Sequence, residues 1–236
     1  MILSSRDNPK VRHWIRLASD SRYRRAQKKA LIEGPHLVEA FLAAGFQPVE
    51  IIRSGETVSE AVFRGIVEVE SPQGIAAEIA IPDGKEDLKR DCVFLEGVQD
   101  AGNVGAIIRS AAAFGIGTMV VDAQCADPWS PKVLRAGQGG HFRLAIVAVK
   151  SLGEELGRFS GTVICTAARG GADLRQASLR GRLAWVFGSE GAGLSERVLE
   201  EADVKVAIPI ASGTESLNVA ASAAICLYAG FSKPAA

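Results

Sequence analysis

Three short apolar runs, each followed at once by a polar loop, constrain the fold of this chain most strongly. The runs cover residues 92–98, 183–187 and 204–210, and each loop leads into a segment with the apolar spacing of a helix. Apolar strands that alternate with helices are typical of a parallel sheet covered on both faces. Because ligands bind outside the carboxyl ends of such strands, the sequence predicts one composite site formed by the three loops.

The third loop leads into a helix made mostly of small residues. Pro209 has no N–H and therefore ends the preceding strand. Ser216 and Asn218 are both preferred N-cap residues for the helix that follows. The expected apolar face of this helix consists of Leu217, Ala220, Ala221, Ala224 and Tyr228. Small side chains on such a helix favour close approach of its backbone to other segments and to a flat, partly polar ligand.

The first 81 residues show a looser alternation of helices and strands. Residues 5–29 indicate two helical pieces with an apolar stripe, and strands are expected at 30–33, 49–52, 67–69 and 77–81. A helix is expected from Gly34-Pro35 to Gly45, with Leu37, Val38, Phe41 and Leu42 inward, and another at 59–64. This alternation predicts a small α/β domain at residues 1–85. A polar linker follows, and a second domain is expected at 91–236.

In that second domain the pattern predicts strands and helices in regular alternation. The expected strands are 92–95, 118–121, 145–149, 162–166, 183–187 and 204–208, and the expected helices are 104–114, 131–137, 152–158, 195–201 and 217–229.

The composition is that of a soluble globular protein, with 47% hydrophobic and 23% charged residues in a chain of 236. No apolar run is long enough to cross a membrane, and basic residues interrupt the N-terminus where a signal peptide would be apolar. The cysteines are dispersed without metal-ligand spacing, at Cys92, Cys125, Cys165 and Cys226. We therefore expect buried thiols in a reducing cytoplasm and no metal site.

Charge is distributed unevenly along the chain, although the net charge is zero. Residues 1–30 hold nine basic and two acidic residues, a net charge of +7, which leaves −7 on the remainder. A basic arm on an acidic body is suited to bind phosphates. A solvated amphipathic helix explains the same charges equally well.

Three motifs carry a family resemblance. They are Asn103-x-Gly-x-x-x-Arg109-x-Ala-x-x-Phe114-Gly115, Phe187-Gly-Ser-Glu190-Gly-x-Gly193-Leu and Ile208-Pro-x-x-x-x-x-x-Ser216-Leu-Asn218-Val. In this order they resemble the motifs of the SpoU (TrmH-like) branch of the SPOUT RNA methyltransferases, over roughly residues 90–230. The resemblance implies an α/β fold with a mostly parallel sheet and a deep trefoil knot, an exception to the rule that chains do not thread loops. It also implies a homodimer, S-adenosylmethionine as methyl donor and a ribose 2′-hydroxyl in RNA as acceptor.

The same resemblance implies roles for individual residues. Catalytic roles fall on Asn103, Arg109, Glu190, Ser216 and Asn218, and cofactor contacts on Phe187, Gly188, Gly193, Ile208, Ser216 and Leu217. We expect RNA contacts from Arg22, Arg24 and Arg25 in the basic arm, and from Lys132 and Arg135 in a segment that resembles the family between the first two motifs. The proposed role of Arg109 is activation of the ribose hydroxyl. A guanidinium is not deprotonated in proteins, so phosphate binding and alkoxide stabilisation are the easier physical account, and the sequence leaves both open.

Each of these residues also has a structural interpretation. An isolated helical arginine is usually a surface residue, Asn103 is suited to cap its helix, and Glu190 is suited to accept N–H bonds from its own turn. Gly188, Gly191 and Gly193 are typical turn formers, and their spacing fits neither a dinucleotide fingerprint nor a P-loop. Trp129 is suited either to stack on a base or to pack in the core. Similarly, His141 has either a structural role or, with Arg143, a place facing RNA.

The segment from Ala30 to Glu39 resembles the start of the N-terminal substrate-binding domain of many SpoU enzymes, itself similar to a small ribosomal RNA-binding protein. Because the transfer-RNA branch typically lacks this domain, the resemblance favours ribosomal RNA over transfer RNA as substrate. A non-catalytic RNA-binding or ribosome-assembly protein on the same fold is an alternative, which the intact motif residues disfavour. A dehydrogenase-like nucleotide binder is a third possibility, which the missing dinucleotide fingerprint disfavours.

Overall fold

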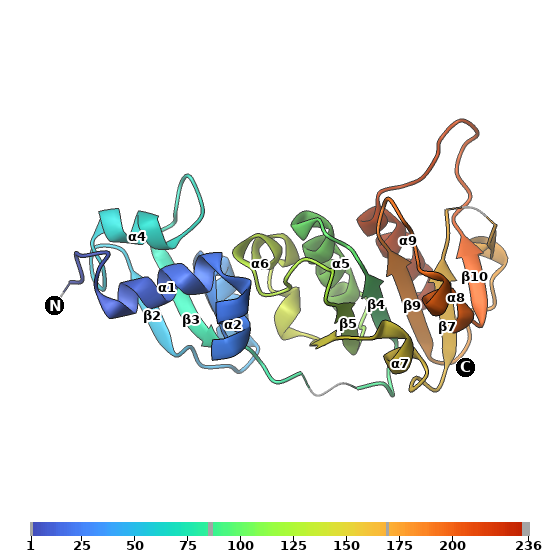
Figure 1. Cartoon of the computed structure of the whole chain (residues 1–236), viewed down its shortest axis with the longest axis horizontal. Helices are drawn as coiled ribbons and strands as arrows, with labels where there is room; N and C mark the ends of the chain where they lie inside the picture. The colour runs from blue at the N-terminus through green and yellow to red at the C-terminus, as the bar shows by residue number, and fades with distance from the viewer. Residues whose placement is uncertain (1, 85–86, 169, 233–236) are drawn as a thin grey trace.

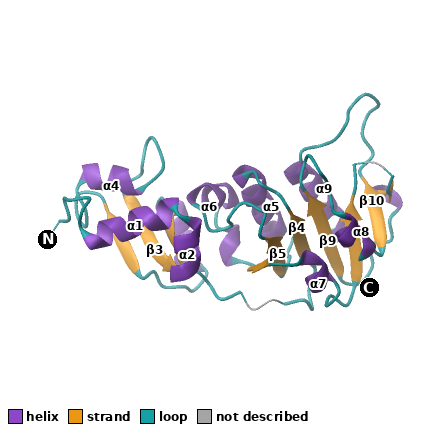
Figure 2. Cartoon of the chain, in the orientation of Figure 1, coloured by secondary structure: helices purple, strands orange, loops and turns teal. Residues whose placement is uncertain are grey.

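The computed structural model describes residues 2–84, 87–168 and 170–232, which build two β-sheets along the long axis of the molecule (Figures 1 and 2). One sheet has three strands in the order β1-β3-β2, and the other has seven in the order β6-β5-β4-β9-β7-β10-β8. The predicted α/β class with a mostly parallel sheet is confirmed. The deep knot remains a prediction.

The three-stranded sheet is antiparallel, and its helices begin at favourable caps. Asn8, Asp20 and Ser59 each accept backbone N–H bonds in the first turn of the helix that follows. The elements are α1 (Pro9–Ser19), α2 (Ser21–Gln27), β1 (Lys29–Glu33), α3 (Pro35–Ala43), β2 (Glu50–Arg53), α4 (Glu60–Ile66) and β3 (Ile75–Ala80).

The seven-stranded sheet is parallel at every pairing between the described strands. Its first half contains β4 (Cys92–Glu96), α5 (Ala101–Ala113), β5 (Thr118–Asp122), α6 (Pro131–Gly137) and β6 (Ala145–Val149). Its second half contains α7 (Leu152–Leu156), β7 (Thr162–Thr166), β8 (Ala172–Asp173), β9 (Leu183–Gly188), α8 (Glu196–Glu200), β10 (Val204–Ala207) and α9 (Val219–Phe231). The two-residue β8 was not predicted because so short a strand has no period to detect.

Both faces of this sheet are buried, which explains the nearly continuous apolar runs of its strands. On β4, Val93 and Leu95 belong to the cluster formed with α5 and α9, whereas Cys92 and Phe94 belong to the cluster formed with α7 and α8. The chain passes from β4 outward to β5 and β6 and then returns to the other side of β4. The strand order therefore reverses next to β4, where open α/β sheets bind ligands.

Two predictions for the first sheet were wrong. Residues 67–69 form no strand, because Val67 ends α4 and packs with Val69 against the core beneath α1. Their apolar character comes from this burial. Leu42 was expected to face inward but is 40% exposed, whereas Leu37, Val38 and Phe41 of the same helix are buried.

The buried face of α9 also differs from the predicted one. Val219, Ala223, Cys226 and Leu227 face the core, while Tyr228 is 60% exposed. Alanine is compatible with both sides of a helix, so the alanine-rich run did not fix which face turns inward.

A hydrophobic cluster joins the two sheets. Trp129, Leu134 and Phe142, which follow β5, pack against seven residues of β1, α3 and β3: Ala30, Ile32, Leu37, Val38, Phe41, Ala77 and Ile79. Beside this cluster, Arg24 of α2 is 3% exposed and pairs with Asp127 at 2.7 Å. Apolar packing and a buried ion pair therefore hold α2 and the first sheet against the second.

Candidate functional site

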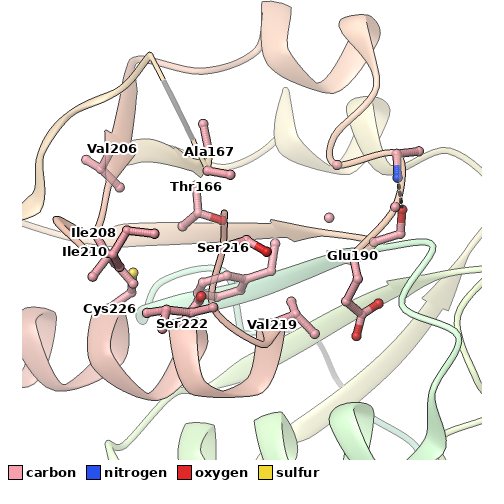
Figure 3. Close-up of a pocket in the computed structure, with 18 residues that line it drawn as sticks. Thr166, Ala167, Glu190, Val206, Ile208, Ile210, Ser216, Val219, Ser222 and Cys226 are labelled. Atoms are coloured by element: carbon pink, nitrogen blue, oxygen red, sulfur yellow. Dashed lines mark hydrogen bonds between the residues drawn. The ribbon is translucent and has the colours of Figure 1, made fainter. Parts of the chain in front are cut away.

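A cavity of about 320 Å³ lies at the carboxyl ends of β7, β9 and β10 (Figure 3). Its walls come from the end of β7, the 188–193 loop, the 208–217 segment and one side of α9. Its volume falls in the range of small-molecule sites. The parallel strands bring the second and third predicted loops to one edge of the sheet, whereas the loop after β4 does not line the cavity and adjoins it through the hydrogen bond from Asn103 to Glu190.

The 188–193 loop is shaped by a close backbone contact. A Cβ atom on Gly188 would lie 2.3 Å from the carbonyl carbon and oxygen of Gly193. Gly193 has a φ of 69° and donates its N–H to the carbonyl of Ser189 at 3.0 Å. The turn therefore needs glycine at both positions. A Cβ on Gly191, in contrast, would have no neighbour within 4 Å.

A chain of side-chain hydrogen bonds connects the three motifs. The amide nitrogen of Asn103 donates to Glu190 Oε1, and Asn218 Nδ2 donates to Asn103 Oδ1 at 2.9 Å. Asn218 Oδ1 in turn accepts the N–H groups of Ala220 and Ala221 and caps α9. The start of α5, the 188–193 loop and the start of α9 thus hold one another in place. In Figure 3 the Glu190 carboxylate points toward α5, away from the end of the pocket formed by Ile208 and Cys226.

The structure decides two of the capping alternatives. Asp100, rather than Asn103, caps α5, because its Oδ1 accepts the Asn103 N–H at 2.8 Å. The Asn103 side chain is therefore available for Glu190 and Asn218. Likewise Asn218, rather than Ser216, caps α9.

The predicted cofactor residues all line the cavity: Phe187, Gly188, Gly193, Ile208, Ser216 and Leu217. Of the predicted catalytic residues, Glu190 and Ser216 line it too, and Asn103 and Asn218 adjoin it through Glu190. Arg109 does not line it. This residue is exposed on α5 and borders a different hollow, beside α3.

Several lining residues were not predicted from the sequence. Thr166 ends β7, Ala167 and Ala168 follow it, and Ser222 and Cys226 lie on α9. Because β7 runs parallel to β9, its carboxyl end reaches the same edge, so the predicted strand at 162–166 contained the necessary signal. Burial raises the pKa of the Cys226 thiol to about 12, so it lines the pocket as a neutral group.

Most predicted RNA contacts lie on the surface, but Arg24 is an exception. Arg22, Arg25 and Lys132 are exposed. Arg24 was expected to contact RNA, but its guanidinium is occupied by Asp127 and by the carbonyl oxygens of Leu17 and Ala18. That assignment was wrong because a buried, fully engaged guanidinium cannot reach phosphate.

Three other side chains have structural surroundings. Arg135 is half-buried beside Glu33, whose pKa is raised by burial despite the arginine charge. Trp129 is buried in the cluster between the sheets, which matches core packing rather than base stacking. His141 is also buried. Burial lowers its pKa to about 4, and its Nε2 lies 2.8 Å from the Pro128 carbonyl oxygen.

The described part of the chain contains neither a cluster of metal-binding side chains nor a helix that could span a membrane. Residues 2–84, 87–168 and 170–232 contain no group of three or more His, Cys, Asp or Glu side chains placed to hold a metal ion. No helix within those ranges has the length and apolar character needed to cross a membrane.

Comparison with known proteins agrees with this architecture. Residues 91–228 match the SpoU rRNA Methylase family, and residues 8–57 match the MRM3-like substrate binding domain. The chain is 34% identical to the 23S rRNA (guanosine(2553)-2′-O)-methyltransferase RlmP of Bacillus subtilis, covering 96% of this chain and 97% of that protein. An AdoMet-bound rRNA methyltransferase from Sinorhizobium meliloti superposes with a TM-score of 0.86 at 25% identity, covering 98% and 97% of the two chains. A solved RNA 2′-O ribose methyltransferase gives 0.80 at 28% identity, covering 98% of each chain.

The parallel α/β sheet with a pocket at its strand ends, together with these matches, places the chain in the class of RNA methyltransferases with the SPOUT fold. Within that class the chain belongs to the SpoU rRNA methylase family.

The two exposed arginines of the basic arm, Arg22 and Arg25, give a test of RNA binding. Replacing Arg22 and Arg25 by alanine is expected to weaken RNA affinity severalfold and to lower the slope of log affinity against log salt by about 1.5, because fewer counterions are released. Fluorescence anisotropy with labelled RNA measures both quantities, and Arg24 is left intact because it supports the fold. Arg53→Ala with Arg64→Ala removes two other exposed arginines of the same domain as a control. Unchanged affinity and slope would show that the arm is only a solvated helix.

Proposed function

We propose that this protein transfers a methyl group from S-adenosylmethionine to a ribose 2′-hydroxyl of ribosomal RNA. The observation that carries the proposal is the cavity formed by the 188–193 and 208–217 segments, with Glu190 held by Asn103 at its edge. The family membership and the names of the relatives support the same reaction.

The residues that line the cavity suit this cofactor. Ile208, Leu217 and Val219 offer apolar surface, and Thr166, Ser216 and Ser222 offer hydroxyl groups. The ends of β7 and β9 add backbone groups beyond the sheet ladder. When bound there, S-adenosylmethionine supplies a methyl group on a positively charged sulfur. The protein then needs to place the acceptor hydroxyl in line and to stabilise the alkoxide that develops on it.

We assign these two tasks to different residues. Glu190, Asn103 and Asn218 form the ordered polar edge of the pocket and orient the groups that approach it. Arg109 binds the phosphate next to the target ribose and stabilises the developing negative charge electrostatically, since a guanidinium stays protonated in proteins. Preorganised donors of this kind stabilise a transition state without reorganisation at the moment of reaction.

We further propose that residues 1–85 form the RNA-binding domain, that residues 91–236 form the catalytic domain, and that the protein acts in the cytoplasm. The domain match at residues 8–57 supports a ribosomal substrate over a transfer RNA, although a transfer-RNA methyltransferase remains the alternative. The decisive experiment maps 2′-O-methyl positions in RNA from cells with and without the gene, together with calorimetric titration of S-adenosylmethionine. In cells without the gene, we expect loss of the 2′-O-methyl group at one position of ribosomal RNA. An unchanged map and no cofactor binding to the purified protein, with or without RNA, would contradict the proposal.

We also propose that the protein is a homodimer paired through α9. Ile225, Tyr228 and Phe231 of α9 are 41%, 60% and 62% exposed. The Phe114 ring lies beside Tyr228 and Phe231, with centroids 5.9 and 5.7 Å away. Exposed apolar patches of this kind mark association surfaces, and a two-fold axis through the patch would bury it against itself.

The double substitution Tyr228→Asp with Phe231→Asp is expected to convert the dimer into a monomer, because it places two charges in the apolar contact. Analytical ultracentrifugation at micromolar concentration measures the change. Val49→Asp, at a residue that is 51% exposed far from α9 in the sequence, is the control and is expected to stay dimeric. A wild-type protein that is monomeric and fully active would remove the proposal.

A further inference from the structure

A second hollow, of about 580 Å³, lies between the two sheets. On one side it is walled by α3, and on the other by α5 and the 137–143 turn after α6. Its lining residues are His36, Ala40, Ala43, Ala44, Arg109, Ala112, Ala113, Gly137, Gln138, Gly139, Gly140, Phe142 and Arg143. We call this hollow the interdomain groove.

The groove is basic. Arg109 and Arg143 line it, and no aspartate or glutamate does. Neither arginine has an ion pair to a carboxylate within the described ranges of the chain, in contrast to Arg24, which is engaged by Asp127. Two arginines that converge on a hollow without a protein counterion are suited to an anionic ligand.

The shape of the groove is set before any ligand arrives. Gly139 has a φ of 83°, and a Cβ on it would lie 2.8 Å from the Cβ of Ala40 on α3. The turn backbone therefore lies directly against α3, and alanines along α3 and α5 keep the space beside it open. A preformed groove lowers the part of the ordering cost that the protein would otherwise contribute on binding.

Among the described residues that line the groove, the exposed imidazole of His36 is the only aromatic ring free to stack on a base. Phe142 is its only aromatic ring apart from His36, and Phe142 packs inward against Phe41 at 5.1 Å between centroids. Recognition of bases in single strands depends on exposed aromatic rings. The charges and small residues of this groove therefore suit the sugar–phosphate backbone rather than the bases.

We infer that the interdomain groove binds the backbone of an unpaired RNA strand next to the target ribose, with Arg143 as a phosphate-binding residue beside Arg109. The inference rests on the proposed function for its choice of RNA as the polyanion. Arginine presents a planar fork that binds phosphate through two N–H donors. A strand held in this groove passes Arg109 on α5, the helix whose Asn103 adjoins the cofactor pocket.

Two substitutions test the groove by different means. Arg143→Ala removes a charge, and Ala44→Trp fills the space at an exposed wall position without removing any charge. Arg180→Ala removes one exposed arginine far along the second sheet and is the matched control. The probes are a fluorescein-labelled single-stranded RNA of mixed sequence and a hairpin duplex of the same composition, both read by anisotropy over a range of salt concentrations.

Arg143→Ala is expected to weaken single-strand affinity about tenfold, as for loss of one charged hydrogen-bonding group, and to lower the salt slope by about 0.7. Ala44→Trp is expected to weaken affinity while leaving the salt slope of the remaining contacts largely unchanged. Affinity for S-adenosylmethionine, measured by calorimetry, should stay at the wild-type value in both variants. Arg180→Ala should match wild type in every measurement.

The inference is overturned if both groove variants bind single-stranded RNA as wild type does, or if Arg180→Ala loses as much affinity. Equal losses for the hairpin duplex would overturn the assignment to an unpaired strand. Because the readout is RNA affinity rather than methylation, it is separable from the proposed function. A wild-type protein that neither binds S-adenosylmethionine nor methylates RNA would refute the function and leave the groove result standing.

Discussion

Arg109→Ala is expected to lower methyl transfer by roughly 10²-fold or more, the scale seen when one preorganised charge-stabilising donor is removed. The fold should survive, because Arg109 is exposed while Val104, Ile107 and Ile108 hold α5 against the core. Affinity for S-adenosylmethionine should also survive, because Arg109 does not line the cofactor cavity. Single-turnover methylation of RNA, with calorimetry of cofactor binding, measures the two effects separately.

Lysine at position 109 distinguishes two origins of the effect. Lysine keeps the positive charge but loses the planar fork that binds phosphate through two N–H donors. Weak rescue by Arg109→Lys is expected if positioning by the fork matters, and strong rescue if charge alone matters. A variant with alanine at 109 that methylates RNA at the wild-type rate would refute the assignment. Glu190, Ser216 and Asn218 would then be the remaining candidates.

The second large effect is expected at Gly188. A methyl group there would collide with the Gly193 backbone at 2.3 Å, so the 188–193 loop has to shift. Backbone shifts forced by overpacking destabilise a protein by about 1–3 kcal/mol, and we expect cofactor affinity to fall by a similar amount, roughly 5- to 150-fold. Calorimetric titration of Gly188→Ala with S-adenosylmethionine measures this loss.

Gly191→Ala is the matched control for this experiment. It adds the same methyl group two residues before Gly193, at a position where a Cβ would have no protein atom within 4 Å. Gly191 also lacks a positive φ, so alanine fits its backbone conformation. Because Gly191 also lines the cavity but no backbone has to shift, cofactor affinity is expected to fall by less than in Gly188→Ala. Equal affinity in Gly188→Ala and wild type would show that the loop tolerates the shift and that the pocket is assigned to the wrong residues.

Most elements of the second sheet were predictable because their local patterns agree with their burial. Residues 162–166 and 131–137 were predicted with the bounds that β7 and α6 have in the structure. The strand at 67–69 was wrong because an apolar stretch looks the same whether it pairs in a sheet or packs as irregular chain. The inward face of α9 was wrong because alanine gives the hydrophobic pattern little contrast between faces.

The site shows the same division between local and distant information. The motifs that resemble the family predicted cavity residues in the 187–193 and 208–217 segments, but not those at the end of β7 or on α9. The bonds that order the motifs join residues far apart: Asn103 and Glu190 are separated by 87 positions, and Asn103 and Asn218 by 115. The wrong assignment of Arg24 to RNA has the same cause, because its partner Asp127 lies 103 positions away in the sequence. In the sequence an arginine that binds RNA and one that closes a buried ion pair are indistinguishable.

The cluster that joins the two sheets limits how far this protein is modular. Trp129, Leu134 and Phe142 belong to the methylase half of the chain, yet their apolar surface is covered by β1, α3 and β3. A catalytic half produced alone would carry that surface uncovered, along with an Asp127 deprived of Arg24. Exchange of the N-terminal domain for another therefore requires more than a compatible linker, because the incoming domain must also bring a matching apolar face. Recombination between relatives can redirect such an enzyme to a new RNA only where this face is kept.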